Sequence, residues 1–177
     1  MKKYDATILV VEGNTNDRVF MERAFRKLGV KGPVQLLSSG DEAIAYMKGE
    51  GRYADRQEYA YPSFVLTDLK MPHGDGFSVL AFLKRNPEWA VIPTVVLSGS
   101  ASHAEVKKAY RLGASSFHIK PVAQDDFLKL LSILHQYWMT CEVPEVDDAG
   151  KQLPTFGEDK MGEGSADPAP TSRPKPS

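Results

Sequence analysis

The sequence predicts an α/β domain built on a five-stranded parallel sheet with helices on both faces. Short apolar runs alternate with amphipathic segments five times along the 177 residues. The runs are apolar throughout and rich in β-branched residues, which is typical of strands buried on both faces. Strands that alternate with helices in this way run parallel and are joined by right-handed crossovers.

The first strand is expected at residues 8–11 (ILVV), and it ends directly on Glu12. Asn14 can cap the helix that follows, and Asp17 would favour the positive end of that helix. We therefore assign Asp17 to a helix-capping role. The apolar face of the helix carries Phe20, Ala24 and Leu28.

The second strand is expected at residues 34–37, and residues 38–41 (SSGD) open the second helix. Residues 48–61 are polar and contain three tyrosines, which indicates a longer connection at the surface. These tyrosines either pack within the loop or form a contact surface.

The third strand is expected at residues 63–67, with Asp68 at its carboxyl end. Ligands bind at this edge of open α/β sheets, so Asp68 should face a small ligand. Pro72 prevents immediate helix continuation, and two glycines then allow a tight loop before a helix at 77–85.

The remaining elements repeat the pattern. The fourth strand, at 94–97, runs into Ser98, and the fifth, at 116–119, runs into Lys120. Helices are expected at 101–112 and 124–139, the second of them capped by Asp125 or a neighbour of Gln124.

The composition excludes several classes of protein. The net charge is −1 with no basic stripe, so a nucleic-acid surface has no electrostatic support. No apolar stretch is long enough to span a membrane, and the first residues lack the features of a signal peptide. The single cysteine, Cys141, excludes an internal disulfide. These features predict a soluble cytoplasmic protein without nucleic-acid or membrane partners.

The helical pattern ends near residue 140, which divides the chain into a domain at 1–140 and a tail at 141–177. The tail is rich in Pro, Gly, Asp and Glu and has few large apolar residues, so we expect it to be disordered.

The residues at the strand ends have a common chemistry. Carboxylates such as Glu12 and Asp68 are ligands that Mg²⁺ prefers. Lys120 offers a positive charge for a phosphoryl group, and the Ser98 hydroxyl can donate to one of its oxygens. Together they meet the needs of phosphoryl transfer to a carboxylate, with Asp68 as the nucleophile.

Four motifs, LVVEG, VLTDLKMP, VVLSGSA and FHIKP, resemble in order and spacing the receiver domain of two-component response regulators. The likeness covers residues 6–138 and is nearest to the stand-alone type that partners bacterial phytochromes. It implies a flavodoxin-like (βα)5 fold and Mg²⁺-dependent transfer of phosphate from the histidine of a sensor kinase to Asp68. Such a domain is a self-phosphorylating phosphoacceptor rather than a turnover enzyme, and the kinase could be a bacteriophytochrome.

The same resemblance implies further roles for single residues. The backbone carbonyl of Lys70 would join Glu12 and Asp68 as a metal ligand. Ser98 and Phe117 would form a switch pair, and the Lys120–Pro121 peptide bond would be cis.

One departure from the family pattern concerns the metal. The family has two adjacent acidic residues after the first strand, and this chain has Glu12 followed by Gly13. The loss of a carboxylate should weaken Mg²⁺ binding. Two versions remain open: a receiver that is still phosphorylated on Asp68, and a pseudo-receiver that binds partners independently of phosphorylation.

Two further hypotheses follow from the sequence. A flavin-binding or small hydrolytic enzyme could use the same fold, although neither a Gly-rich phosphate loop nor a Ser/His/Asp arrangement is evident. The last helix carries more apolar surface than a one-sided helix needs, through Leu128, Ile133 and Tyr137. This surplus favours a homodimer or partner face, or cover by the tail.

Overall fold

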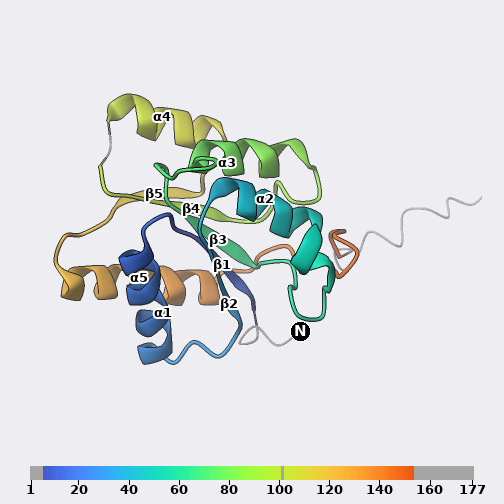
Figure 1. The fold of residues 1–177 in the computed structure, drawn as a ribbon, viewed down its shortest axis with the longest axis horizontal. Coiled ribbons are helices and arrows are strands. Elements are labelled where there is room, and N and C mark those ends of the chain that lie inside the picture. The colour runs from blue at the N-terminus through green and yellow to red at the C-terminus, as the bar shows by residue number, and fades with distance from the viewer. Residues whose placement is uncertain (1–5, 101, 154–177) are drawn as a thin grey trace, which may run out of the picture.

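The computed structural model describes residues 6–100 and 102–153 and has the predicted parallel sheet at its centre. Five strands pair in the order β2-β1-β3-β4-β5 (Figure 1). Their bounds are β1 Ile8–Val11, β2 Val34–Leu37, β3 Phe64–Thr67, β4 Thr94–Ser98 and β5 Ser116–Ile119. The predicted fold class is therefore confirmed, and each strand lies within one residue of its predicted range.

The helices cover both faces of the sheet. Their bounds are α1 Thr15–Lys27, α2 Gly40–Lys48, α3 Gly76–Arg85, α4 His103–Arg111 and α5 Gln124–Thr140. Helices α1 and α5 lie on one face, and α2, α3 and α4 lie on the other (Figure 1). None of the helices in the described ranges is long and apolar enough to cross a membrane.

The core is divided by the sheet, because side chains of a strand point alternately to its two faces. In β1, Ile8 and Val10 pack with residues of α1 and α5, whereas Leu9 and Val11 pack with residues of α2 and α3. Burial on both faces explains why the strands are apolar without alternation.

Helix termini follow the local sequence in most cases. Asn14 caps α1 as predicted, and its side chain accepts hydrogen bonds from the amides of Asn16 and Asp17. The predicted cap of α5 is wrong: the N-cap residue is Ala123, and no side chain caps this helix. An acidic side chain in the first turn, such as Asp125, interacts with the helix dipole without forming a cap.

The three tyrosines of residues 48–61 pack against other aromatic rings of the protein. Tyr53, in the short 3₁₀ helix η2 (Gly51–Ala54), is buried and contacts the rings of Tyr46 and Tyr59. Tyr61 stacks at an angle on Trp89. Loop packing rather than an open contact surface accounts for the aromatic content.

The structure also differs from the expected tail over residues 141–153. Val146 pairs with Gln152 in an isolated bridge, and the carbonyl of Gly150 accepts a hydrogen bond from the Trp89 indole (3.2 Å). Gly150 has a φ of +76°, and a Cβ there would lie 2.8 Å from the Tyr61 hydroxyl, so glycine is required. Residues 154–177 of the predicted tail lie outside the described residues, and the domain boundary at 140 stays a prediction.

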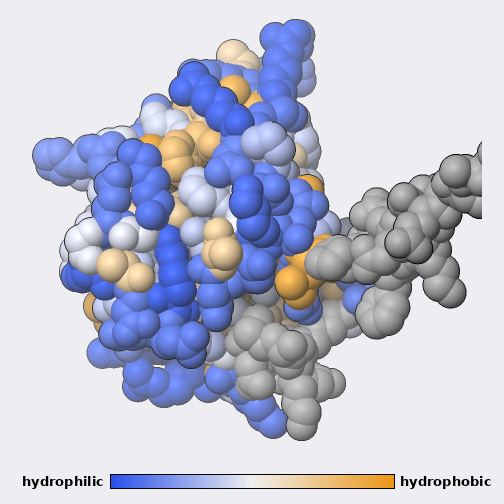
Figure 2. Space-filling view, turned by 90° about the vertical axis from the view of Figure 1, so that its right-hand side faces the viewer, coloured by the Kyte–Doolittle hydropathy of each residue, from blue (hydrophilic) through white to orange (hydrophobic). Residues whose placement is uncertain are grey.

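The side of the molecule that carries η2 and this C-terminal segment is largely hydrophilic. Apolar side chains form only small, separate patches there (Figure 2). Within the segment at 141–153, Gly150 bonds to Trp89, and Val146 packs against the core cluster that contains Tyr53.

Candidate functional site

An open cleft of about 530 Å³ lies at the carboxyl ends of the central strands. Its lining comes from the segments after β1, β3, β4 and β5 and from the first turns of α1 and α5, and includes Asp17, Asp68, Lys70, Ser98 and Lys120. The strand ladders continue into this edge, since the amide of Asp68 donates to the Val11 carbonyl and that of Lys120 to the Ser98 carbonyl. The fold thus brings the predicted strand-end residues to one place.

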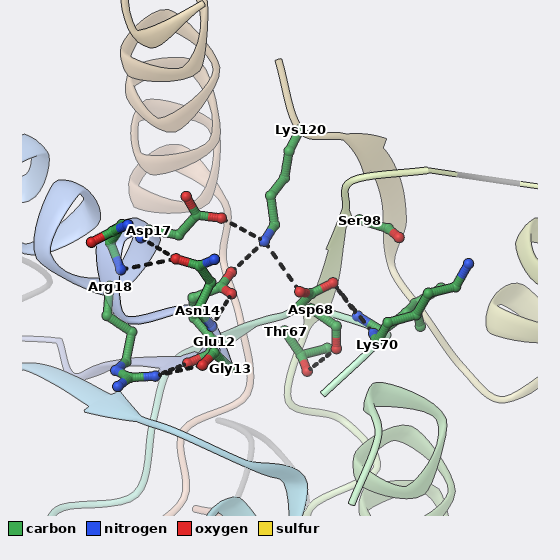
Figure 3. A network of polar contacts seen from close by, with 12 residues as sticks. Glu12, Gly13, Asn14, Asp17, Arg18, Thr67, Asp68, Lys70, Ser98 and Lys120 are labelled. Carbon is green, nitrogen blue, oxygen red and sulfur yellow. Dashed lines mark hydrogen bonds and ion pairs between the residues drawn. The ribbon is translucent and has the colours of Figure 1, made fainter. Parts of the chain in front are cut away.

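Lys120 is the centre of the polar network (Figure 3). Its Nζ lies 2.5 Å from Glu12 Oε2, 3.1 Å from Asp17 Oδ2 and 3.2 Å from Asp68 Oδ2. The lysine side chain is largely buried, at 9% exposure. Three carboxylates therefore converge on one ammonium group at the edge of the cleft.

Glu12 is buried beneath the cleft. Its second oxygen, Oε1, accepts a hydrogen bond from the amide of Asn14 (2.8 Å). Burial raises the pKa of the Glu12 carboxyl, and the bonds from Lys120 and Asn14 act in the opposite direction. This carboxylate is held in one orientation by two donors.

Burial by itself would lower the pKa of Lys120, but its hydrogen bond to Glu12 and the charges of Glu12 and Asp68 outweigh burial and raise that pKa. The lysine is therefore positively charged at neutral pH. Its charge partly compensates the negative charge of the carboxylates.

The two oxygens of the Asp68 carboxylate have different partners. Oδ1 accepts a hydrogen bond from the amide of Leu69 (2.6 Å), and Oδ2 faces Lys120. The side chain is 12% exposed and lines the cleft. It is fixed in orientation and still open to a small ligand.

The other predicted residues lie as follows. Ser98 lines the cleft, but its hydroxyl donates to the carbonyl of Ser100 (2.7 Å) rather than to Asp68. Phe117 does not line the cleft; it packs against the cluster that contains Leu69 and Val96. The Lys120–Pro121 bond, expected to be cis, is trans.

Lys70 bridges the mouth of the cleft. Its Nζ lies 3.0 Å from Glu105 Oε1 and 3.3 Å from Ser100 Oγ. Glu105 belongs to a capping box with Ser102 at the start of α4. No hydrogen bond from the described residues reaches the backbone carbonyl oxygen of Lys70, which leaves it available as a ligand.

The loop after Asp68 is anchored on the first turn of α2. The amide of Gly40 donates to the Gly74 carbonyl (2.9 Å), and the amide of Asp41 donates to the His73 carbonyl (3.1 Å). Gly74 has a φ of +89°, and a Cβ on Gly40 would lie 2.6 Å from the Gly74 oxygen. Both glycines are needed for this close approach.

The position of Gly13 is crowded. A Cβ at this residue would lie 3.1 Å from Met71 Cγ and 3.3 Å from Pro72 Cδ. A side chain at residue 13 would therefore need Met71 and Pro72 to shift by a few tenths of an ångström.

Asp17 is the site residue that sequence reasoning missed. The sequence predicts a capping role for Asp17, and the structure places its carboxylate against Lys120 and in the lining of the cleft. The signal was present in the sequence, because α1 begins at the same edge of the sheet where β1 ends. Its first turn must therefore lie beside the strand-end residues.

The donor chemistry fits a hard divalent cation. Carboxylates and a free backbone carbonyl are oxygen ligands of the kind Mg²⁺ takes together with water. Within residues 6–100 and 102–153, no three His, Cys, Asp or Glu side chains are arranged to hold a metal by themselves. A cation here would therefore depend on the Lys70 carbonyl and water as well as on carboxylates.

Comparison with known proteins gives one consistent result. The family model described as "Response regulator receiver domain" matches residues 8–132. The chain is 34% identical over 135 residues to the probable methanogenesis regulatory protein FilR2 of Methanothrix harundinacea, covering 75% of this chain and 83% of that protein.

Two further response regulators, one of them named for a phytochrome, are also similar. The crystal structure of the phosphorylated cyanobacterial phytochrome response regulator RcpA has a TM-score of 0.74 at 29% identity, covering 79% of this chain and 99% of that one. Rcp1 of Synechocystis is 28% identical over 132 residues, covering 75% of this chain and 88% of that protein. Its Mn²⁺-bound structure has a TM-score of 0.72 at 28% identity and covers 79% of this chain and 99% of that one.

Proposed function

This chain belongs to the response regulator receiver domain family, and from that membership we propose that it accepts a phosphoryl group on Asp68 from a sensor histidine kinase. A carboxylate oxygen of Asp68 would form a bond to phosphorus while the bond between phosphorus and the kinase histidine breaks. The product is an acyl phosphate on this chain and a free histidine on the kinase. The domain is a phosphoacceptor and not a turnover enzyme.

The observation that supports this proposal is the position of Asp68 beside Lys120. The ammonium lies 3.2 Å from Asp68 Oδ2, where it can neutralise charge on an incoming phosphoryl group. The amide of Leu69 holds the other carboxylate oxygen and so fixes the orientation of the nucleophile. The cleft leaves room for a phosphoryl group next to this carboxylate.

Ser98 and Phe117 are proposed to report the modified state. The Ser98 hydroxyl can exchange its bond to the Ser100 carbonyl for one to a phosphoryl oxygen. Phe117 lies on β5, whose Ile119 is paired in register with Ser98 of β4. A shift of the end of β4 would thus be felt along the strand that carries Phe117.

We propose Mg²⁺ as the cofactor, held by Glu12, Asp68 and the Lys70 carbonyl. When bound, it would neutralise negative charge on the phosphoryl oxygens. Receiver domains bind divalent metals, and a relative of this chain has been solved with Mn²⁺. The missing carboxylate at Gly13 is expected to weaken this binding.

The partner is proposed to be a bacteriophytochrome kinase. Similarity to the cyanobacterial phytochrome response regulator RcpA supports this choice. Output would then pass through contact with other proteins.

The proposal is tested by incubating the protein with Mg²⁺ and a small acyl phosphate and measuring its intact mass. We expect one added phosphoryl group on the wild type and none on Asp68→Asn. Asp75→Asn is the matched control, because Asp75 caps α3 in the same loop and does not line the cleft. Equal labelling of Asp68→Asn and the control would refute Asp68 as the acceptor.

A second candidate is a pseudo-receiver that binds partners without taking phosphate. The glycine at residue 13 favours it, since the site lacks the second acidic residue of the family pattern. A wild-type protein that binds its kinase but gains no mass would establish this candidate. The flavin-binding alternative would give visible absorbance in the purified protein, and family membership argues against it.

A further inference from the structure

We propose that Asp17 supplies the negative charge that the site lacks at Gly13 and thereby sets its affinity for a divalent cation. This inference rests on the proposed function, because it assigns a residue to the same cleft. It concerns the first turn of α1, which the family pattern of adjacent acidic residues does not include.

The first argument is the charge of the cluster. Three carboxylates face one ammonium, so the cluster has a net charge of −2, which is two uncompensated negative charges. Without Asp17, only one would remain. Two uncompensated charges suit a dication, and Asp17 restores the number that a carboxylate at residue 13 would have given.

The second argument is the position of the Asp17 side chain. Its Oδ2 lies 3.1 Å from Lys120 Nζ, and the side chain is 37% exposed in the lining of the cleft. One side of the carboxylate thus meets the buried lysine, and the rest faces the space that a ligand would enter.

The third argument is that the local backbone holds this position. The Asn14 side chain accepts hydrogen bonds from the amides of Asn16 and Asp17, which fixes the first turn of α1. The amide of Asn14 in turn donates to Glu12. Glu12 and Asp17 are therefore connected through the cap and share Lys120.

The fourth argument is that no other basic residue neutralises Asp17 within the described part of the chain. Arg18, the next residue along α1, donates instead to the carbonyls of Glu12 and Gly13, at 2.6 and 3.1 Å. Only Lys120 forms an ion pair with Asp17 there. The charge of Asp17 is thus available to the cleft.

The crowding around Gly13 supports the same assignment. Met71 and Pro72 lie where a side chain at residue 13 would begin. A carboxylate at that position would require these side chains to shift by a few tenths of an ångström, whereas Asp17 already lines the cleft.

The experiment compares Mn²⁺ binding by the wild type, Asp17→Asn and Asp17→Glu. Free Mn²⁺ is measured directly by electron paramagnetic resonance, so the readout does not depend on phosphorylation. We expect Asp17→Asn to weaken binding about tenfold, the effect of removing one charge a few ångströms from a dication in a wet site. Asp17→Glu keeps the charge and should keep most of the affinity.

Glu22→Gln is the matched control. Glu22 lies on the same helix, pairs with Arg26 at the surface and does not line the cleft, so its charge should not affect binding. Equal affinities of Asp17→Asn and Glu22→Gln would overturn the inference. Circular dichroism of each variant separates lost binding from lost folding, and Asp17→Ala repeats the test if the asparagine variant is unfolded.

The two proposals can fail separately. If the wild type is phosphorylated on Asp68 and Asp17→Asn binds Mn²⁺ as the wild type does, only the role of Asp17 is refuted. If the wild type neither binds Mn²⁺ nor gains a phosphoryl group, the proposed function is refuted and the role of Asp17 with it.

Discussion

Glu12 shows how the site stabilises a buried charge. Glu12 is 1% exposed, and a buried carboxylate is unfavourable unless hydrogen-bond donors pair with it. Lys120 and the Asn14 amide provide those donors. Removing Lys120 would leave Glu12 buried without its counter-charge, so Lys120 matters for folding as well as for chemistry.

The crowding around Gly13 affects what a substitution at this residue would do. Gly13→Asp restores the family's second carboxylate but must displace Met71 by a few tenths of an ångström. Because Met is flexible, we expect the substitution to be tolerated and Mg²⁺ to bind about tenfold more tightly.

The control for this prediction is Gly13→Ala, which adds the Cβ without the charge. Isothermal titration calorimetry is the suitable measurement, because neither Trp89 nor Trp138 lines the cleft and their fluorescence would report poorly. Equal Mg²⁺ affinities of the aspartate and alanine variants would contradict the prediction.

At the scale of elements, one of the three residues predicted to add apolar surface to α5 is packed against the core instead. Leu128 packs against the core with the rest of the apolar stripe, whereas Ile133 and Tyr137 are 63% and 57% exposed. The described part of the C-terminal segment contacts Glu88 and Trp89 instead of these two residues. We therefore retain the proposal of a homodimer through the last helix.

If α5 forms a dimer, Ile133→Glu should shift the protein toward the monomer, because it would bury a charge without a partner. Sedimentation velocity at two concentrations measures the change. Val19→Glu on α1 is the control, since Val19 is also an exposed apolar residue but lies on another helix. A wild type that is monomeric at both concentrations would exclude the dimer.

The sequence predicted the elements well because burial on both faces leaves a plain signal in the strands. It also predicted that Glu12, Asp68 and Lys120 meet, since parallel strands bring their carboxyl ends to one edge. It did not predict the ion pair of Asp17, because an acidic residue at the start of a helix is equally consistent with a capping role. Nor did it predict the contacts of Trp89, which depend on how a polar segment folds back.

At the scale of the whole molecule, residues 145–153 return to the edge of the sheet opposite the cleft. The amide of Gln152 donates to Glu88 (2.9 Å), and its side-chain amide donates to the Pro87 carbonyl (3.0 Å). With the bond from Trp89 to Gly150, these contacts tie the end of the described chain to the turn after α3.

Ending the chain at residue 141 should therefore lower the free energy of unfolding by about 2 kcal/mol, the net effect of losing a few hydrogen bonds. Ending it at residue 153 keeps the contacts and should change stability little. Urea unfolding of the two shortened proteins and the full chain measures both effects. If the two shortened proteins were equally stable, the contacts of this segment would be of no energetic importance.

The close approach of Gly40 and Gly74 has a consequence for genetics. Gly40 does not line the cleft, yet any side chain there would collide with the loop that begins just after Asp68. Mutational screens for altered signalling would therefore recover codon 40 together with codons of the cleft itself. Genetically, the first turn of α2 would behave as part of the site, although it touches no ligand.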